Sequence, residues 1–223
     1  MKLTVHLAEQ SYDIFLTRGC LAEAGRYMNL NRKVLLVTDT GVPQQYADAI
    51  AAQCKEAYKV VLPAGEKSKS MDSFSLLLSK MLQASFTRLD CVVAIGGGVM
   101  GDLAGFTASC YMRGIDFYNV PTTLLAQVDS SIGGKTAIDF SGIKNSVGSF
   151  YQPCTDCIYH DRGQHLDSEC NGIMNQILEE LIWICGDFLR DIVQRDLGRI
   201  RMESDRVYRV QWIKWHDCQG LKT

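Results

Sequence analysis

Short apolar runs alternate with helix-compatible segments over the first 125 residues of the chain. Runs of strand length occupy residues 3–7, 12–16, 34–38, 58–62, 91–95 and 117–120. The first two runs are close enough to predict a hairpin, and the later ones are separated by segments with helical spacing. Continuous apolar strands that alternate with helices are typical of a parallel sheet buried on both faces. We therefore expect an α/β fold with a Rossmann-like, mostly parallel sheet and helices on both faces.

The helical segments are expected over residues 20–28, 40–53 and 71–84. In the last of these, apolar residues recur at the three- and four-residue spacing of a helix face. The side chains expected to point inward are Leu77, Leu78, Met81 and Leu82.

A glycine-rich turn follows the run at residues 91–95, where the sequence reads CVVAIGGGVMGD. Gly96, Gly98 and Gly101 satisfy the pattern G-x-G-x-x-G after a predicted strand and before a helical segment. Residues without Cβ let the backbone N–H groups approach a pyrophosphate closely at a helix N-terminus. The pattern favours a dinucleotide phosphate cradle, and the alternative is a plain tight turn.

Polar residues follow each of the predicted parallel strands. Asp39 ends one strand, Glu66 and Lys69 come after the next, and Asp102 follows the glycines. Since ligands of such sheets bind at the carboxyl ends of the strands, we expect these side chains to converge in space. Asp39 either accepts hydrogen bonds from a ribose or caps the following helix.

Residues 124–153 form a loop-prone stretch with an unusual density of charged and polar residues. Lys135 follows two glycines, and Lys144 precedes Asn145. Flexible backbone at these places would let both ammonium groups approach an anionic ligand. The alternative is a solvated surface loop.

Composition excludes several classes of partner. The chain of 223 residues is 47% hydrophobic with a formal net charge of −2 and no basic run, so nothing favours nucleic acid or an anionic membrane. No segment approaches the ~18 uninterrupted apolar residues of a membrane span, and the N-terminus lacks the apolar core of a signal peptide. Nine cysteines without regular spacing are typical of a reducing compartment. We expect a cytoplasmic protein.

The chain resembles 3-dehydroquinate synthase, the cyclising enzyme of the shikimate pathway, over about residues 30–153. The resemblance rests on the order and spacing of the blocks PAGEKSK, GGGVMGDLAGFTAS, RG, VPTTLLAQVDSSIGGKTAID and KNSVGSFYQP. It implies an N-terminal domain that binds NAD and a C-terminal helical domain that binds a divalent metal, zinc or cobalt. The implied reaction converts 3-deoxy-D-arabino-heptulosonate 7-phosphate to 3-dehydroquinate and phosphate.

The resemblance also implies two sets of site residues, carried over position by position. The implied NAD contacts are Asp39, Glu66, Lys69, Gly97, Gly98, Val99, Asp102, Thr122, Thr123 and Lys144. The implied substrate contacts are Arg113, Asp129, Lys135 and Asn145. The position of Arg113 in this family reaches the site of a neighbouring subunit, which implies a homodimer. Lys135, with Asn145 and Arg113, would hold the phosphate dianion, and the metal would polarise the hydroxyl that is oxidised.

The family pattern is not legible after Pro153. We expect residues 1–153 to form the NAD-binding domain with its substrate loop, and residues 154–223 to form an incomplete or divergent helical tail without a recognisable set of metal ligands. Weak or no synthase turnover is the consequence for this chain. The candidates for metal ligands in the tail are His160, His165, Glu179, Glu180 and His216.

Three accounts of the tail stay open. A shift of reading frame over residues 154–166 would restore a strand and turn like those of the family. Alternatively, apolar residues at helical spacing over residues 173–197 predict a genuine amphipathic helix. The third account is a small zinc site at Cys154, Cys157, His165 and Cys170, although their spacing is not a standard one.

Three alternatives to 3-dehydroquinate synthase also remain. They are another sugar-phosphate cyclase, a metal-dependent polyol dehydrogenase, and a catalytically inactive NAD-binding module. The block VDSSIGGKTAID with Lys144 and Asn145 favours the synthase.

Overall fold

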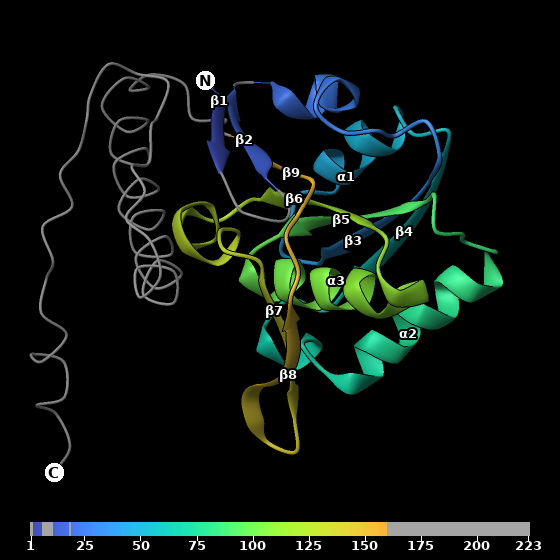
Figure 1. Cartoon of the computed structure of the whole chain (residues 1–223), viewed down its shortest axis with the longest axis vertical. Coiled ribbons are helices and arrows are strands. Elements are labelled where there is room, and N and C mark those ends of the chain that lie inside the picture. The colour runs from blue at the N-terminus through green and yellow to red at the C-terminus, as the bar shows by residue number, and fades with distance from the viewer. Residues whose placement is uncertain (1, 6–10, 18, 160–223) are drawn as a thin grey trace, which may run out of the picture. The chain divides into compact units, whose positions relative to one another are not determined.

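The computed structural model describes residues 2–5, 11–17 and 19–159. Among these residues, seven strands form one sheet in the order β1-β2-β9-β6-β5-β3-β4 (Figure 1). The strands are β1 (Lys2–Val5), β2 (Tyr12–Thr17), β3 (Lys33–Asp39), β4 (Glu56–Leu62), β5 (Cys91–Gly96), β6 (Asp116–Pro121) and β9 (Thr155–Tyr159). Only β1 and β2 pair in antiparallel fashion, and every other pair in this sheet is parallel. The predicted hairpin and the predicted mostly parallel sheet are both confirmed.

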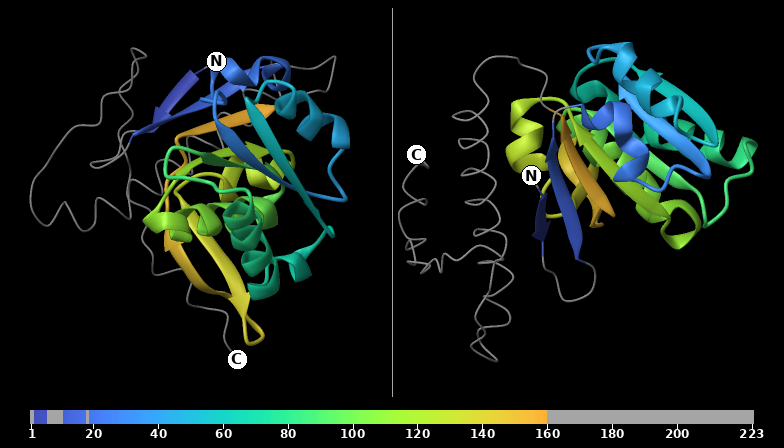
Figure 2. Two further views of the ribbon diagram at one scale, coloured as in Figure 1. Left: turned by 90° about the vertical axis from the view of Figure 1, so that its right-hand side faces the viewer. Right: turned by 90° about the horizontal axis from the view of Figure 1, so that it is seen from above.

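Helices cover both faces of this sheet (Figure 2). On one face lie α2 (Met71–Gln83) and α3 (Gly98–Cys110), and on the other lie η1 (Cys20–Arg26) and α1 (Gln44–Ala51). Short helical turns complete the described part: η2 (Glu66–Ser68), η3 (Tyr111–Arg113) and the π-helical turn η4 (Ala126–Ser130). No helix within the described residues has the length and apolar character needed to cross a membrane.

Strand β3 shows why the central strands are continuous apolar runs. Its side chains alternate between the two faces: Leu35 and Val37 pack in the core under α2 and α3, whereas Val34 and Leu36 pack in the core under η1 and α1. All four are fully buried. A strand covered on both faces needs apolar residues at every position, so the two-residue alternation of a half-exposed strand is absent.

Helix α2 corrects one expectation about the core. Leu77 and Met81 are fully buried and Leu78 packs partly against the same core, as expected, but Leu82 is 64% exposed. Successive residues of an α-helix are rotated by about 100°, so Leu82 lies outside the stripe centred on Leu77 and Met81. Phe86, just after the helix, fills the core there instead.

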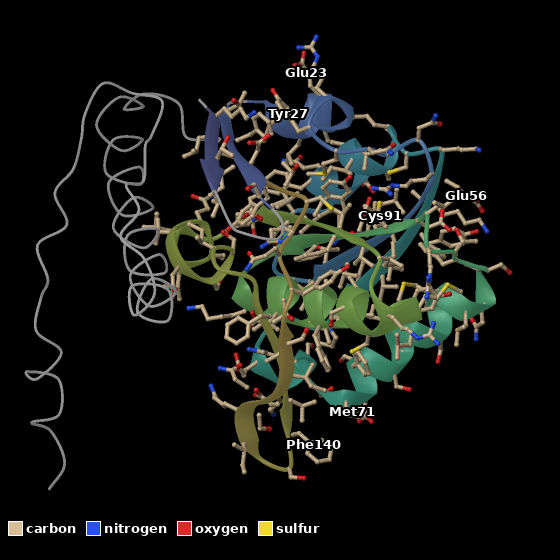
Figure 3. The ribbon with its side chains drawn as sticks, viewed as in Figure 1. Glu23, Tyr27, Glu56, Met71, Cys91 and Phe140 are labelled. Carbon is tan, nitrogen blue, oxygen red and sulfur yellow. The ribbon has the colours of Figure 1, made fainter. Side chains whose placement is uncertain are left out.

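The stretch expected to be loop-prone contains a β-hairpin. Strands β7 (Lys135–Phe140) and β8 (Ile143–Phe150) pair antiparallel and form a separate two-stranded sheet. Ser141 and Gly142 join them with φ of 50° and 78°, the two positive values that a tight hairpin turn of the primed type requires. Figure 3 shows Phe140 at the tip of this hairpin. Strand β8 was missed because most of its residues are exposed and it lacks a buried apolar face.

Strand β9 extends the sheet past the domain boundary that we expected after residue 153. It inserts between β2 and β6, with Asp156 opposite Ile14 on one side and Asn119 on the other. Asp156 is fully buried, and neither of its carboxylate oxygens has a hydrogen-bond partner among the described residues.

Candidate functional site

The glycine loop lies at the carboxyl end of β5, where the chain turns into α3. Gly97 precedes the helix in extended conformation and contributes no side-chain cap. A Cβ at Gly96 would lie 2.7 Å from Cγ of Met100, and a Cβ at Gly98 would lie 2.8 Å from Oγ of Ser130. Both positions therefore lack room for a side chain. The loop presents the first N–H groups of α3, which have no intrahelical acceptor, as a site for an anion.

Asp39 lies beside this loop at the end of the neighbouring strand β3. Its Oδ1 accepts a hydrogen bond from the N–H of Gly41 at 2.7 Å, and its Oδ2 is 3.6 Å from the place of a Cβ at Gly96. The following helix α1 begins at Gln44, after Pro43, so Asp39 does not cap it. Of the two roles left open for Asp39, the helix cap is thus wrong.

Thr122 and Thr123 bring the end of β6 to the same loop. The N–H of Thr122 donates to the carbonyl oxygen of Gly96 at 2.9 Å. The Cγ2 of Thr123 lies 3.4 Å from the place of a Cβ at Gly97, and its hydroxyl accepts from the N–H of Ala126. Three neighbouring strands therefore end around the glycines, as the topology of a parallel sheet predicts.

Lys69 joins the segment after β4 to helix α3 and to the hairpin. Its buried ammonium group donates to the carboxylate of Asp102 and to the side-chain oxygen of Asn145. Burial raises the pKa of Asp102 above its ordinary value, and the hydrogen bond and charge of Lys69 oppose that shift. The backbone N–H of Asn145 also donates to Asp139 at 2.9 Å within the hairpin, and the N–H of Asp139 donates to the carbonyl oxygen of Lys69 at 2.9 Å, which fixes the hairpin against this cluster.

A second contact between the hairpin and the segment after β4 is weaker. Nζ of Lys144 lies 3.5 Å from Oε1 of Glu66, and the two side chains are 71% and 42% exposed. Exposed pairs of this kind contribute at most about 1 kcal/mol. Both side chains remain accessible to a ligand.

A pocket of about 470 Å³ opens between α3, η4 and the hairpin. It brings together three of the four residues implied as substrate contacts, namely Asp129, Lys135 and Asn145, and adds Asp102. The complete lining is Asp102, Asp129, Ser130, Lys135, Thr136, Ala137, Asn145, Ser146, Gly148, Ser149 and Phe150. An ammonium group, an amide and two carboxylates around one cavity suit a ligand that carries both hydroxyl groups and a negative charge.

Arg113 and Val99 stand at opposite ends of α3. Val99 lies in the first turn and packs partly against the core beneath the helix. Arg113 follows the C-terminus, in η3, with φ of 70° and an exposed side chain. Arg113 is not among the residues that line the pocket. Its implied role in a neighbouring subunit stays a prediction.

The described residues contain no group of three or more His, Cys, Asp or Glu side chains that could hold a metal ion. The candidate ligands His160, His165, Glu179, Glu180 and His216 lie outside the described residues, as do Cys170 and the helix expected over residues 173–197. Of the possible zinc ligands, Cys157 lies in β9 and Cys154 directly precedes that strand. Burial raises the pKa of the Cys154 thiol to about 11.

Ser130 and Asp139 are the residues that sequence reasoning missed. Ser130 lines the pocket and touches the glycine loop, and Asp139 holds the backbone of Asn145. The sequence offered one signal for Ser130, which directly follows the implied substrate contact Asp129. No comparable signal pointed to Asp139, whose role depends on the fold of the hairpin.

Comparisons with known proteins agree with this geometry. The family described as 3-dehydroquinate synthase N-terminal matches residues 59–169, so the match continues beyond Pro153. A 3-dehydroquinate synthase of Alkaliphilus metalliredigens is 50% identical over 154 residues, which cover 68% of this chain and 43% of that protein. The chain thus spans less than half the length of the curated relatives it matches.

Solved structures of two cyclases share the fold. A 2-deoxy-scyllo-inosose synthase, complexed with carbaglucose-6-phosphate, NAD+ and Co2+, is 25% identical with a TM-score of 0.67 over 71% of this chain and 46% of that one. A 2-epi-5-epi-valiolone synthase from Streptomyces hygroscopicus subsp. jinggangensis 5008, with NAD+ and Zn2+ bound, is 31% identical with a TM-score of 0.61. The likeness covers 69% of this chain and 44% of that one. With the sequence matches, these likenesses identify residues 59–169 as the N-terminal domain of the 3-dehydroquinate synthase family.

Proposed function

We propose that this chain binds NAD at the glycine loop and contributes the phosphate-binding part of a 3-dehydroquinate synthase site, for which the substrate is 3-deoxy-D-arabino-heptulosonate 7-phosphate. The observation that carries the proposal is the pocket where Asp129, Lys135 and Asn145 meet beside the N-terminus of α3. The domain over residues 1–153, extended by β9, would supply this part of the site.

The NAD contacts follow from the ends of the strands. The first N–H groups of α3 would receive the pyrophosphate, because Gly97 and Gly98 carry no side chain that would hinder its approach. Asp39 would accept hydrogen bonds from a ribose through Oδ2, because Oδ1 already accepts from Gly41. The remaining contacts would come from Val99 and Asp102 of α3, Thr122 and Thr123 after β6, and Glu66, Lys69 and Lys144 around the hairpin.

Charge is the main contribution of the pocket to the reaction. Bound NAD would supply the transient oxidation of a secondary alcohol, after which the substrate can lose phosphate. Lys135 and Asn145 would hold the phosphate dianion, and Lys69 would keep the Asn145 side chain in place through its hydrogen bond. Asp129 would accept hydrogen bonds from substrate hydroxyl groups.

Arg113 would complete this pocket from a second copy of the chain, in a homodimer. Its exposed position beyond the C-terminus of α3, away from the pocket of its own chain, supports that assignment. The described residues do not fit a divalent metal, because no suitable cluster occurs among them, and we derive no step through a metal from them. We also propose slow or no turnover for the 223-residue chain, because its sequence after Pro153 offers no recognisable set of metal ligands.

The identity levels favour the synthase over other cyclases. The curated relatives at 40–50% identity are named 3-dehydroquinate synthase, whereas the two cyclases of other names are 25% and 31% identical. Calorimetric titration of the purified chain with NAD tests the binding half of the proposal. Release of inorganic phosphate from the heptulosonate phosphate tests the enzymatic half, and a chain that binds NAD without such release would be an NAD-binding module.

A further inference from the structure

Ser130 lies where the glycine loop meets the pocket. It is the last residue of η4, and its Oγ is buried without a hydrogen-bond partner among the described residues. That oxygen lies 2.8 Å from the place of a Cβ at Gly98, so the hydroxyl faces the first turn of α3. The same residue lines the pocket together with Asp129 and Lys135. Ser130 thus touches both parts of the proposed site.

The surroundings of this hydroxyl point to an acceptor that the described residues do not provide. A buried hydroxyl without a partner is unfavourable, because it has lost its hydrogen bonds to water. The N-terminus of α3 is also without a side-chain cap, since Gly97 provides none. An O–H donor and the unsatisfied N–H donors of the helix therefore converge on one place. Phosphate oxygens, which are strong acceptors with negative charge, match such a set of donors.

We propose that the Ser130 hydroxyl donates a hydrogen bond to a phosphate oxygen of the bound ligand, alongside the first N–H groups of α3. Lys135 offsets the negative charge that Asp129 places in the same pocket. This inference rests on the proposed function, which supplies two sources of phosphate oxygen. One is the pyrophosphate of NAD and the other is the phosphate group of the sugar substrate.

The test compares two neighbouring serines in the full chain. Ser130→Ala removes the hydroxyl and keeps the site otherwise unchanged. Ser131→Ala is the matched control, because Ser131 is 4% exposed and its Oγ also lacks a partner among the described residues, but it does not line the pocket. Both variants are titrated by calorimetry with NAD and, in the presence of NAD, with inorganic phosphate. Thermal unfolding without ligand checks that both remain folded.

Loss of one hydrogen bond to a charged oxygen should raise the Kd of Ser130→Ala for NAD or for inorganic phosphate roughly tenfold. Both Kd values of Ser131→Ala should stay unchanged. A rise in the NAD titration assigns the hydroxyl to the pyrophosphate, and a rise confined to inorganic phosphate assigns it to the substrate. If the unchanged chain binds NAD and Ser130→Ala matches it in both titrations, the inference is overturned and the proposed function stands. An equal loss in Ser131→Ala would also overturn it, and no NAD binding by the unchanged chain would overturn both.

Discussion

The ammonium group of Lys69 is paired with the carboxylate of Asp102 in a contact that is largely shielded from solvent, with side-chain exposures of 5% and 18%. The pair links the segment after β4 to α3, and through Asn145 it also holds the hairpin. The pocket is consequently built on a buried charge cluster that joins residues far apart in the sequence.

Replacement of Lys69 by Met should destabilise the chain strongly. The carboxylate of Asp102 would stay buried without its cation, and breaking one side of such a pair costs about 3 kcal/mol or more. Urea unfolding measures the change in the free energy of unfolding. Lys144→Met is the control, because the exposed pair with Glu66 should contribute less than about 1 kcal/mol. If the two variants lower the free energy of unfolding equally, the pair of Lys69 and Asp102 contributes no more to stability than the exposed pair.

Stability should fall as the pH rises because of Asp156. Burial raises the pKa of this carboxyl well above its ordinary value, so the folded chain keeps a proton that the unfolded chain loses near pH 4. The stabilisation is complete below the pKa that Asp156 has in the unfolded chain. Each pH unit between that pKa and the pKa in the folded chain lowers the free energy of unfolding by about 1.4 kcal/mol. Unfolding curves measured across this pH range check the slope.

Asp156→Asn should remove most of that slope and raise the free energy of unfolding at pH 7, because an amide needs no proton to stay neutral. Asp48→Asn is the matched control, since the Asp48 side chain is 60% exposed and pairs with Lys59 at the surface. The control should retain the slope. A slope that persists in Asp156→Asn would mean that another group carries the pH dependence.

Lys135→Met should weaken phosphate binding. The ammonium group provides positive charge in the pocket, and its loss should raise the Kd for inorganic phosphate, measured by calorimetry with NAD present, about tenfold or more. Lys80→Met, on the exposed side of α2 and outside the pocket, should behave like the unchanged chain. A normal phosphate affinity in Lys135→Met would remove Lys135 from the site.

Much of the sheet was predictable because burial on both faces leaves a plain trace in the sequence. Continuous apolar runs mark strands β3 and β5, and the glycines that follow mark the loop at the end of β5. The parallel topology then places Asp39, Thr122 and Thr123 beside this loop. The hairpin left no such trace, because β8 is mostly exposed.

The parts of the site that could not be predicted depend on that hairpin. The contact between Lys69 and Asn145 joins residues 76 positions apart and exists only because the turn at Ser141 and Gly142 folds β8 back. The segment at residues 20–28 was expected to be a regular helix, but it forms the 3-10 helix η1 with a break at Glu23, where φ is −124°. Packing against the sheet, which local pattern does not report, decides such details.

The most direct test of the account is a calorimetric titration of the unchanged chain and of Gly98→Val with NAD. A side chain at position 98 would meet the Ser130 hydroxyl and fill the space where the pyrophosphate should approach α3. Gly25→Ala is the control, because a Cβ there would meet only Oε1 of Gln53 at an ordinary 3.7 Å. We predict that the unchanged chain and Gly25→Ala bind NAD and that Gly98→Val loses at least about tenfold in affinity. Equal affinity of Gly98→Val and the unchanged chain would contradict the phosphate cradle on which the proposed function rests.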